Sequence, residues 1–126
     1  MDIPYAGDLT PEEAWQLLAA RPEAVLVDVR TPAEWAAVGV PALEGRDVVL
    51  LPWVTAPGLV NPSFLEELEA LGLAPGTPLV LLCRSGHRSA AAASALTAAG
   101  LGPAFNVAEG YEGWVASGLP WSRPED

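Results

Sequence analysis

One short apolar segment constrains the fold of this chain more than any other. Residues 78–82 form an uninterrupted run bounded by turn residues, which is the pattern of a parallel strand that is buried on both faces. The alanine-rich stretch from Ser89 to Ala99 follows and ends at Gly100, a residue suited to closing a helix. The sequence therefore predicts a strand, a tight loop and a helix in succession, the unit from which parallel sheets are built.

Cys83, the only cysteine of the chain, lies between this strand and this helix. In open α/β sheets, ligands bind at the carboxyl ends of the strands. Backbone N–H groups at a helix start and the guanidinium groups of Arg84 and Arg88 all favour the thiolate, the reactive form of cysteine. A single cysteine is most often a small buried hydrophobic residue. Two arginines, two serines and a glycine directly after it are unsuited to a core segment, so the pattern predicts a reactive thiol.

Length and composition indicate one domain over residues 1–126, with a core from about 9 to 121. No apolar stretch is long enough to cross a bilayer, and the first twenty residues lack the pattern of a signal peptide. One cysteine cannot form an internal disulfide, and no His and Cys cluster indicates a metal site. We expect a soluble cytoplasmic protein with no metal, no cofactor and no membrane partner.

The net charge of −10 arises from sixteen acidic residues against six basic ones. This balance argues against nucleic acid as a partner, because neutralising phosphates requires basic patches. Two of the six basic side chains lie in the loop after Cys83. A small anionic substrate would be attracted there, since salt screens the repulsion from the rest of the chain within about 8 Å.

The remaining segments repeat the alternation of strands and helices, which predicts a parallel sheet with right-handed crossovers. The predicted helices cover residues 10–21, a short segment from 31, 63–71, 89–99 and 111–117. The predicted strands cover residues 24–29, 48–51, 78–82 and 104–107. Thr10 and Thr31 each begin a capping sequence with a glutamate three positions later. Residues 39–62 are the least regular part, and we expect residues 1–8 and 122–126 to be frayed.

The loop residues suggest how a sulfur anion could be stabilised without a general base. Gly86 permits a backbone that bends around the sulfur, so that the N–H groups of residues 84–88 converge on it. Ser85 and Ser89 can add hydroxyl donors, and Ser89 is the expected N-cap of the next helix. His87, the only histidine, lies inside this loop, so we expect it to contribute polarity to the rim rather than to form a catalytic Cys–His pair.

Three separated segments resemble, in order, the motifs of the rhodanese (thiosulfate sulfurtransferase) family. They are the loop 83–89, the segment 27–35, and the segment 106–114 with its continuation 118–121. The resemblance spans residues 25–121 and implies the α/β rhodanese-like three-layer fold, with a five-stranded mainly parallel sheet and helices on both faces. Residues 39–41 (Gly-Val-Pro) and the long segment 52–63 depart from single-domain members, which leaves the acceptor open.

The resemblance implies a sulfurtransferase in which Cys83 attacks the outer sulfur of thiosulfate or another persulfide donor. The resulting persulfide would pass its sulfur to cyanide or a thiol. Asp28 and Arg30 would support the loop through a charge-assisted contact, although a purely structural ion pair is an equal alternative. The residues implied to bind the substrate are Arg84, Ser85, Gly86, His87, Arg88 and Ser89.

Other functions remain open at this point. The protein could carry persulfide sulfur to a partner protein in cofactor or tRNA thiolation, and we expect the thiol to be exposed in a shallow pocket that such an acceptor can reach. A cysteine phosphatase or arsenate reductase is less consistent with the sequence, because those loops hold one more residue between the cysteine and the arginine than separates Cys83 from Arg88. A binding module with an idle cysteine is a further alternative.

Overall fold

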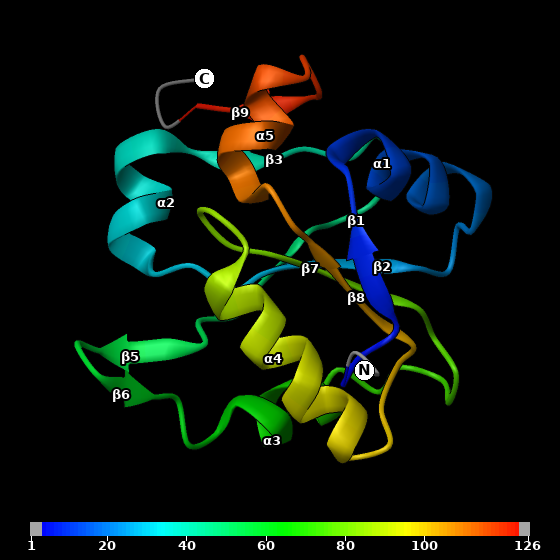
Figure 1. Ribbon diagram of the computed structural model, residues 1–126, viewed down its shortest axis with the longest axis vertical. Coiled ribbons are helices and arrows are strands. Elements are labelled where there is room, and N and C mark those ends of the chain that lie inside the picture. Colours follow the sequence, from blue (N-terminus) through cyan, green and yellow to red (C-terminus); the bar gives the residue numbers. More distant parts are fainter. Residues whose placement is uncertain (1–3, 124–126) are drawn as a thin grey trace.

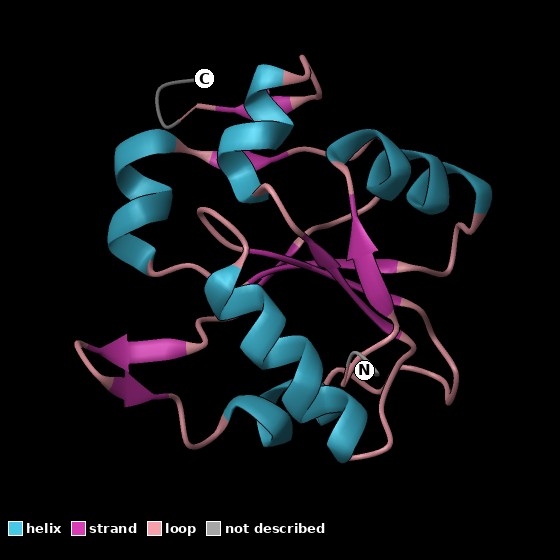
Figure 2. Cartoon of the chain, in the orientation of Figure 1, coloured by secondary structure: helices cyan, strands magenta, loops and turns pink. Residues whose placement is uncertain are grey.

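The computed structural model describes residues 4–123, and a five-stranded sheet forms the centre of the molecule (Figures 1 and 2). Its strands are β1 (Gly7–Leu9), β2 (Val25–Asp28), β4 (Val49–Leu50), β7 (Leu79–Leu82) and β8 (Ala104–Val107). The strand order is β1-β8-β7-β2-β4, and every neighbouring pair is parallel. The predicted α/β class is therefore confirmed, with β7 at the middle of the sheet.

Helices cover both faces of this sheet (Figure 1). They are α1 (Pro11–Ala20), α2 (Pro32–Val38), α3 (Phe64–Glu69), α4 (His87–Ala98) and α5 (Gly110–Ala116). In β7, Val80 and Leu82 pack with α1 and α5, whereas Leu79 and Leu81 pack with α3 and α4. This alternation explains the uninterrupted apolar run, because both faces of the strand are buried.

Two small antiparallel ribbons complete the fold. β3 (Val40–Pro41) pairs with β9 (Trp121–Ser122), and β5 (Val54–Ala56) pairs with β6 (Leu59–Val60). The prediction of frayed ends is wrong for residues 7, 8 and 122, which lie in β1 and β9; residues 1–3 and 124–126 lie outside the described part. Such short segments have little strand propensity of their own, and their pairing comes from the backbones beside them.

The helix starts follow the predicted capping at two places and depart from it at a third. The side chains of Thr10 and Thr31 each complete a capping box, as predicted. The prediction that Ser89 caps α4 is wrong, since the helix begins at His87 and Gly86 is its N-cap. Gly86 adopts a left-handed backbone with a φ of 99°, which ends the loop two residues earlier than the alanine pattern indicates.

No helix among residues 4–123 is long and apolar enough to cross a membrane.

Candidate functional site

The loop from Cys83 to Gly86 leaves the carboxyl end of β7 and enters α4. Because β7 is the central strand, this loop lies where the carboxyl ends of parallel strands meet, the usual ligand site of open α/β sheets. Arg84, Ser85 and His87 are exposed at its rim, whereas Cys83 and Gly86 are buried. The sequence-predicted loop residues are therefore brought together at one edge of the sheet.

The sulfur of Cys83 lies inside a small polar cradle. The backbone N–H of Gly86 donates to Sγ at 3.1 Å, and Ser89 Oγ lies 3.2 Å from it. The prediction of a thiol exposed in a shallow pocket is wrong, because the exposed fraction of Cys83 is 0%. The thiol packs against the α3 and α4 layer of the core, so a substrate reaches Sγ only after the atoms that cover it move.

Glycines allow the loop and the start of α5 to approach each other closely. A Cβ at Gly86 would collide with the carbonyl of Ala108, and a Cβ at Gly110 would collide with the carbonyl of Arg84. The N–H of Tyr111 donates to the carbonyl of Cys83 at 2.7 Å, which ties α5 to the same loop. Motif resemblance included Gly110 without giving it a role; its partner is visible only in the folded chain.

We expect Gly86→Ala to reduce sulfur uptake at Cys83 at least tenfold. The left-handed backbone and the collision with the carbonyl of Ala108 force the loop to shift, and strain of this kind costs on the order of 1–3 kcal/mol. Intact mass after a timed exposure to thiosulfate measures the uptake. Gly118→Ala is the matched control, because its φ is also positive but nothing lies within 4 Å of the added Cβ. Equal uptake by both variants would contradict the prediction.

Arg88 is engaged by a carboxylate of α2. Its Nη1 and Nη2 lie 2.7 and 2.9 Å from the two oxygens of Glu34, and both side chains are partly buried. The hydrogen bond from Arg88 is the main cause that lowers the pKa of Glu34 to about 2, and the same bond raises the pKa of Arg88. Glu34 also completes the capping box of Thr31, which is the only role that sequence alone indicates for it.

We expect Glu34→Gln to destabilise the protein by about 1 kcal/mol at pH 7, the upper range for a partly exposed ion pair. Because folding lowers the pKa of Glu34, its contribution is fully present above its ordinary pKa of 4.5 and is lost as the pH falls toward 2. The difference between Glu34→Gln and the native protein should therefore shrink over this interval. Urea unfolding at pH 7, 4.5 and 3 measures it, and a difference independent of pH would contradict the prediction.

Asp28 and Arg30 form a fully buried ion pair at the end of β2. Arg30 Nη2 lies 2.7 Å from the Asp28 carboxylate and donates to the carbonyl of Gly39 at 2.7 Å. The guanidinium carbon lies 5.1 Å from the ring centre of Tyr111 and 5.2 Å from that of Trp121. These contacts join the end of β2 to α5, β9 and the turn after α2.

Arg84 and His87 occupy the rim of the loop. Arg84 is exposed and lies 3.5 Å from Glu112 of α5, a separation at which solvent weakens the pair. His87 Nδ1 faces the Ser85 hydroxyl at 3.5 Å, which agrees with the expected rim position. Because Arg88 is paired closely with Glu34 and Arg84 is exposed, Arg84 is the loop guanidinium more available to an anion.

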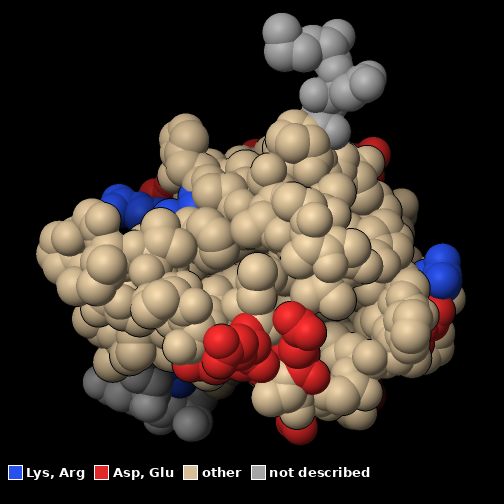
Figure 3. Space-filling view, turned by 90° about the horizontal axis from the view of Figure 1, so that it is seen from below, with Lys and Arg blue, Asp and Glu red and all other residues tan. Residues whose placement is uncertain are grey.

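Acidic side chains gather on the face seen from below Figure 1, and basic side chains lie toward its edges (Figure 3).

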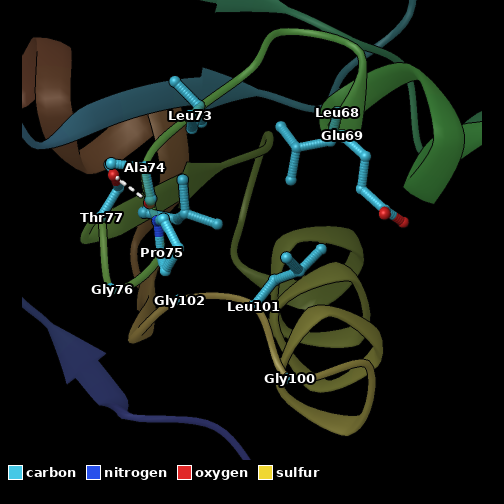
Figure 4. A pocket seen from close by; sticks show the side chains of 11 residues that line it. Leu68, Glu69, Leu73, Ala74, Pro75, Gly76, Thr77, Gly100, Leu101 and Gly102 are labelled. Carbon is cyan, nitrogen blue, oxygen red and sulfur yellow. Dashed lines mark hydrogen bonds between the residues drawn. The ribbon is translucent and has the colours of Figure 1, made fainter.

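A separate cavity of about 340 Å³ lies at the other end of the sheet (Figure 4). It is bounded by the end of α3, the loop before β7 and the loop after α4. Leu79, the first residue of β7, lines it, whereas Cys83 follows the last residue of that strand. This cavity therefore belongs to a different part of the molecule.

Among residues 4–123, no group of three or more His, Cys, Asp or Glu side chains could hold a metal ion.

Comparison with known proteins agrees with this geometry. The model of the rhodanese-like domain family matches residues 10–117. A protein of Allochromatium vinosum named sulfurtransferase is 31% identical and covers 94% of this chain and 97% of its own length. A crystal structure from M. tuberculosis is 48% identical with a TM-score of 0.83, covering 94% of this chain and 98% of its own. The polysulfide-sulfur transferase homodimer of Wolinella succinogenes is 28% identical with a TM-score of 0.73. The match covers 94% of this chain and 79% of that chain.

Proposed function

Because this chain belongs to the rhodanese-like domain family, we propose that it is a sulfurtransferase in which Cys83 carries the transferred sulfur as a persulfide. The observation that carries this proposal is the polar cradle around Sγ, built from the Gly86 N–H and the Ser89 hydroxyl at the carboxyl end of β7. Relatives named as sulfurtransferases support the reaction class. We further propose that residues 1–126 act as a single domain and that the protein works in the cytoplasm, where an unpaired thiol stays reduced.

The proposed reaction proceeds in two displacements at sulfur. The Cys83 thiolate attacks the outer sulfur of thiosulfate, a new S–S bond forms, and sulfite leaves with the electron pair of the bond that breaks. A nucleophile such as cyanide or a thiolate then attacks the terminal sulfur of the persulfide and takes it. The bonding pair returns to Cys83, which regenerates the thiolate. No redox partner or cofactor is required for this cycle.

The loop residues take distinct roles in this proposal. Backbone N–H groups of residues 84–88, including that of Gly86, hold the terminal sulfur after the loop opens, and the Ser85 hydroxyl adds a donor. The Ser89 hydroxyl adds another once its proton turns from Asn106 to the sulfur. Arg84 attracts the anionic donor and stabilises departing sulfite. Arg88 contributes less charge than its position suggests because Glu34 neutralises it. His87 contributes polarity at the rim.

The polysulfide-sulfur transferase named among the solved structures supports a persulfide or polysulfide as an alternative donor. A second candidate is transfer of the persulfide sulfur to a partner protein in cofactor or tRNA thiolation. Since Cys83 is buried, this role requires that the partner open the loop. Both candidates use the same Cys83 persulfide, so the chemistry of the loop does not identify the sulfur donor or the acceptor. Assays with different donors and acceptors identify them.

Intact mass of the reduced protein tests the proposal directly. We expect a gain of one sulfur after thiosulfate and its loss after cyanide, with Cys83→Ser as the control that gains none. A gain with polysulfide but not with thiosulfate would show that polysulfide is the donor, and the proposed Cys83 persulfide would still stand. No gain with either would contradict the proposal, and a phosphatase assay would then examine one of the other functions that the sequence leaves open.

A further inference from the structure

Hydrogen bonds connect the sulfur of Cys83 to the edge strand β1. Ser89 Oγ lies 3.2 Å from Sγ and donates to Asn106 Oδ1 of β8 at 2.5 Å. Asn106 Nδ2 in turn donates to Asp8 Oδ1 at 3.0 Å, and the Tyr5 hydroxyl donates to the same oxygen at 2.7 Å. Asp8 lies opposite Asn106 in the register of β1 and β8. The hydrogen bonds thus run from the sulfur of Cys83, through β8, to the edge strand of the sheet.

The orientation of the Asn106 amide follows from the chemistry of its two neighbours. A carboxylate only accepts hydrogen bonds, so Asp8 must face the amide nitrogen. The amide oxygen then faces Ser89, whose hydroxyl has a single proton to donate. At 2.5 Å that proton is directed to Asn106 and is not available to the sulfur. Ser89 Oγ therefore presents a lone pair to Sγ, which suits a protonated thiol that donates and disfavours a thiolate that accepts.

We propose that Asp8 is a positioning residue that, through Asn106 and Ser89, keeps Cys83 protonated in the closed loop. Freeing the Ser89 proton would let the hydroxyl donate to the thiolate. The proposal rests on the proposed function only in taking the thiolate as the reacting form.

Other charged groups surround the loop and set the background of the titration. They come from the loop itself, from α2, from the end of β2, from α4 and from α5, and they are Arg84, His87, Arg88, Glu34, Asp28, Arg30 and Glu112. None of them is altered by a substitution at Asp8. A change in thiolate formation after such a substitution therefore arises from Asp8 itself, by charge or by orientation.

Thiolate absorbance at 240 nm tests the proposal, since the chain has one cysteine and Cys83→Ser supplies the background. We expect Asp8→Ala to lower the midpoint of thiolate formation by about one pH unit, a tenfold change in equilibrium. Asp8→Asn places an amide that donates as well as accepts opposite Asn106, so it no longer fixes the orientation of that amide and should also lower the midpoint. Tyr5→Phe keeps both Asp8 and Asn106 and should leave the midpoint unchanged.

Repeating the Asp8 substitution in the Ser89→Ala variant separates the effect of the Asn106 orientation from the effect of the Asp8 charge. In Ser89→Ala the hydroxyl is absent, so adding Asp8→Ala should cause no further shift. An equal shift in both backgrounds, or no shift by Asp8→Ala in the native background, would overturn the proposal. If Asp8→Ala does not fold by circular dichroism, Asn106→Ala removes the oxygen that accepts the Ser89 proton and should also lower the midpoint; no shift there would overturn the proposal. The titration needs no sulfur donor, so its outcome is independent of the sulfurtransferase assay.

Discussion

Cys83→Ser is expected to reduce sulfur transfer by a factor on the order of 10³ or more, because it removes the only atom that can form the persulfide. A serine hydroxyl is far less acidic than a thiol, and no described hydrogen bond joins Sγ to a histidine or carboxylate that could activate it as a base. Thiocyanate formation from thiosulfate and cyanide measures the loss, and intact mass shows whether any sulfur is retained.

The fold should survive this substitution. The Gly86 N–H still meets an acceptor in the serine oxygen, and the side chain changes by a single atom. We expect a cost of about 1 kcal/mol for placing a hydroxyl in this buried position. Cys83→Ala serves as the second inactive variant without a hydroxyl. A Cys83→Ser protein that folds and still transfers sulfur would contradict the assignment of Cys83.

Arg30→Met is expected to lower the free energy of unfolding by about 3–5 kcal/mol, the usual cost of leaving a buried charge without its partner. Asp28 and Arg30 are both inaccessible to solvent, so the remaining carboxylate would have no water to replace the guanidinium. The carbonyl of Gly39 would also lose its donor. Urea unfolding followed by tryptophan fluorescence measures the change.

Arg21→Met is the matched control, because it makes the same substitution in an exposed pair. Arg21 lies 2.8 Å from Glu23, with side chains that are 55% and 51% exposed, and its loss should lower the free energy of unfolding far less than the loss of Arg30 does. The double variant Asp28→Asn with Arg30→Met should recover part of the stability, since no charge is then left alone. If Arg30→Met and Arg21→Met cost the same, burial does not determine the strength of the Asp28–Arg30 pair.

Local patterns in the sequence predicted much of the sheet and the position of the site. The apolar run at 78–82 and the capping sequences at Thr10 and Thr31 act over a few residues, and the structure confirms each of them. The loop after Cys83 could also be predicted from local sequence, because its arginines, serines and glycine are incompatible with a core segment. Its place at the carboxyl end of β7 follows from the strand and helix on either side.

Long-range contacts decided what the sequence did not show. β1 contains a glycine and an aspartate and is a strand only because β8 offers its backbone, so the prediction that residues 7 and 8 fray is wrong. Glu34 and Arg88 lie 54 positions apart, and Asp8 and Asn106 lie 98 apart. No periodicity or capping pattern relates residues at such separations.

The sequence by itself determined the α/β class, the central strand and the single thiol in its polar loop, because apolar periodicity, caps and turn residues are local properties. Only the tertiary structure decided that the thiol is buried, that Arg88 is neutralised by Glu34, and that Asp8 reaches the site through Asn106. These features depend on how the parallel strands are ordered and how α2 and β1 pack beside the loop. Such packing is set by the chain as a whole.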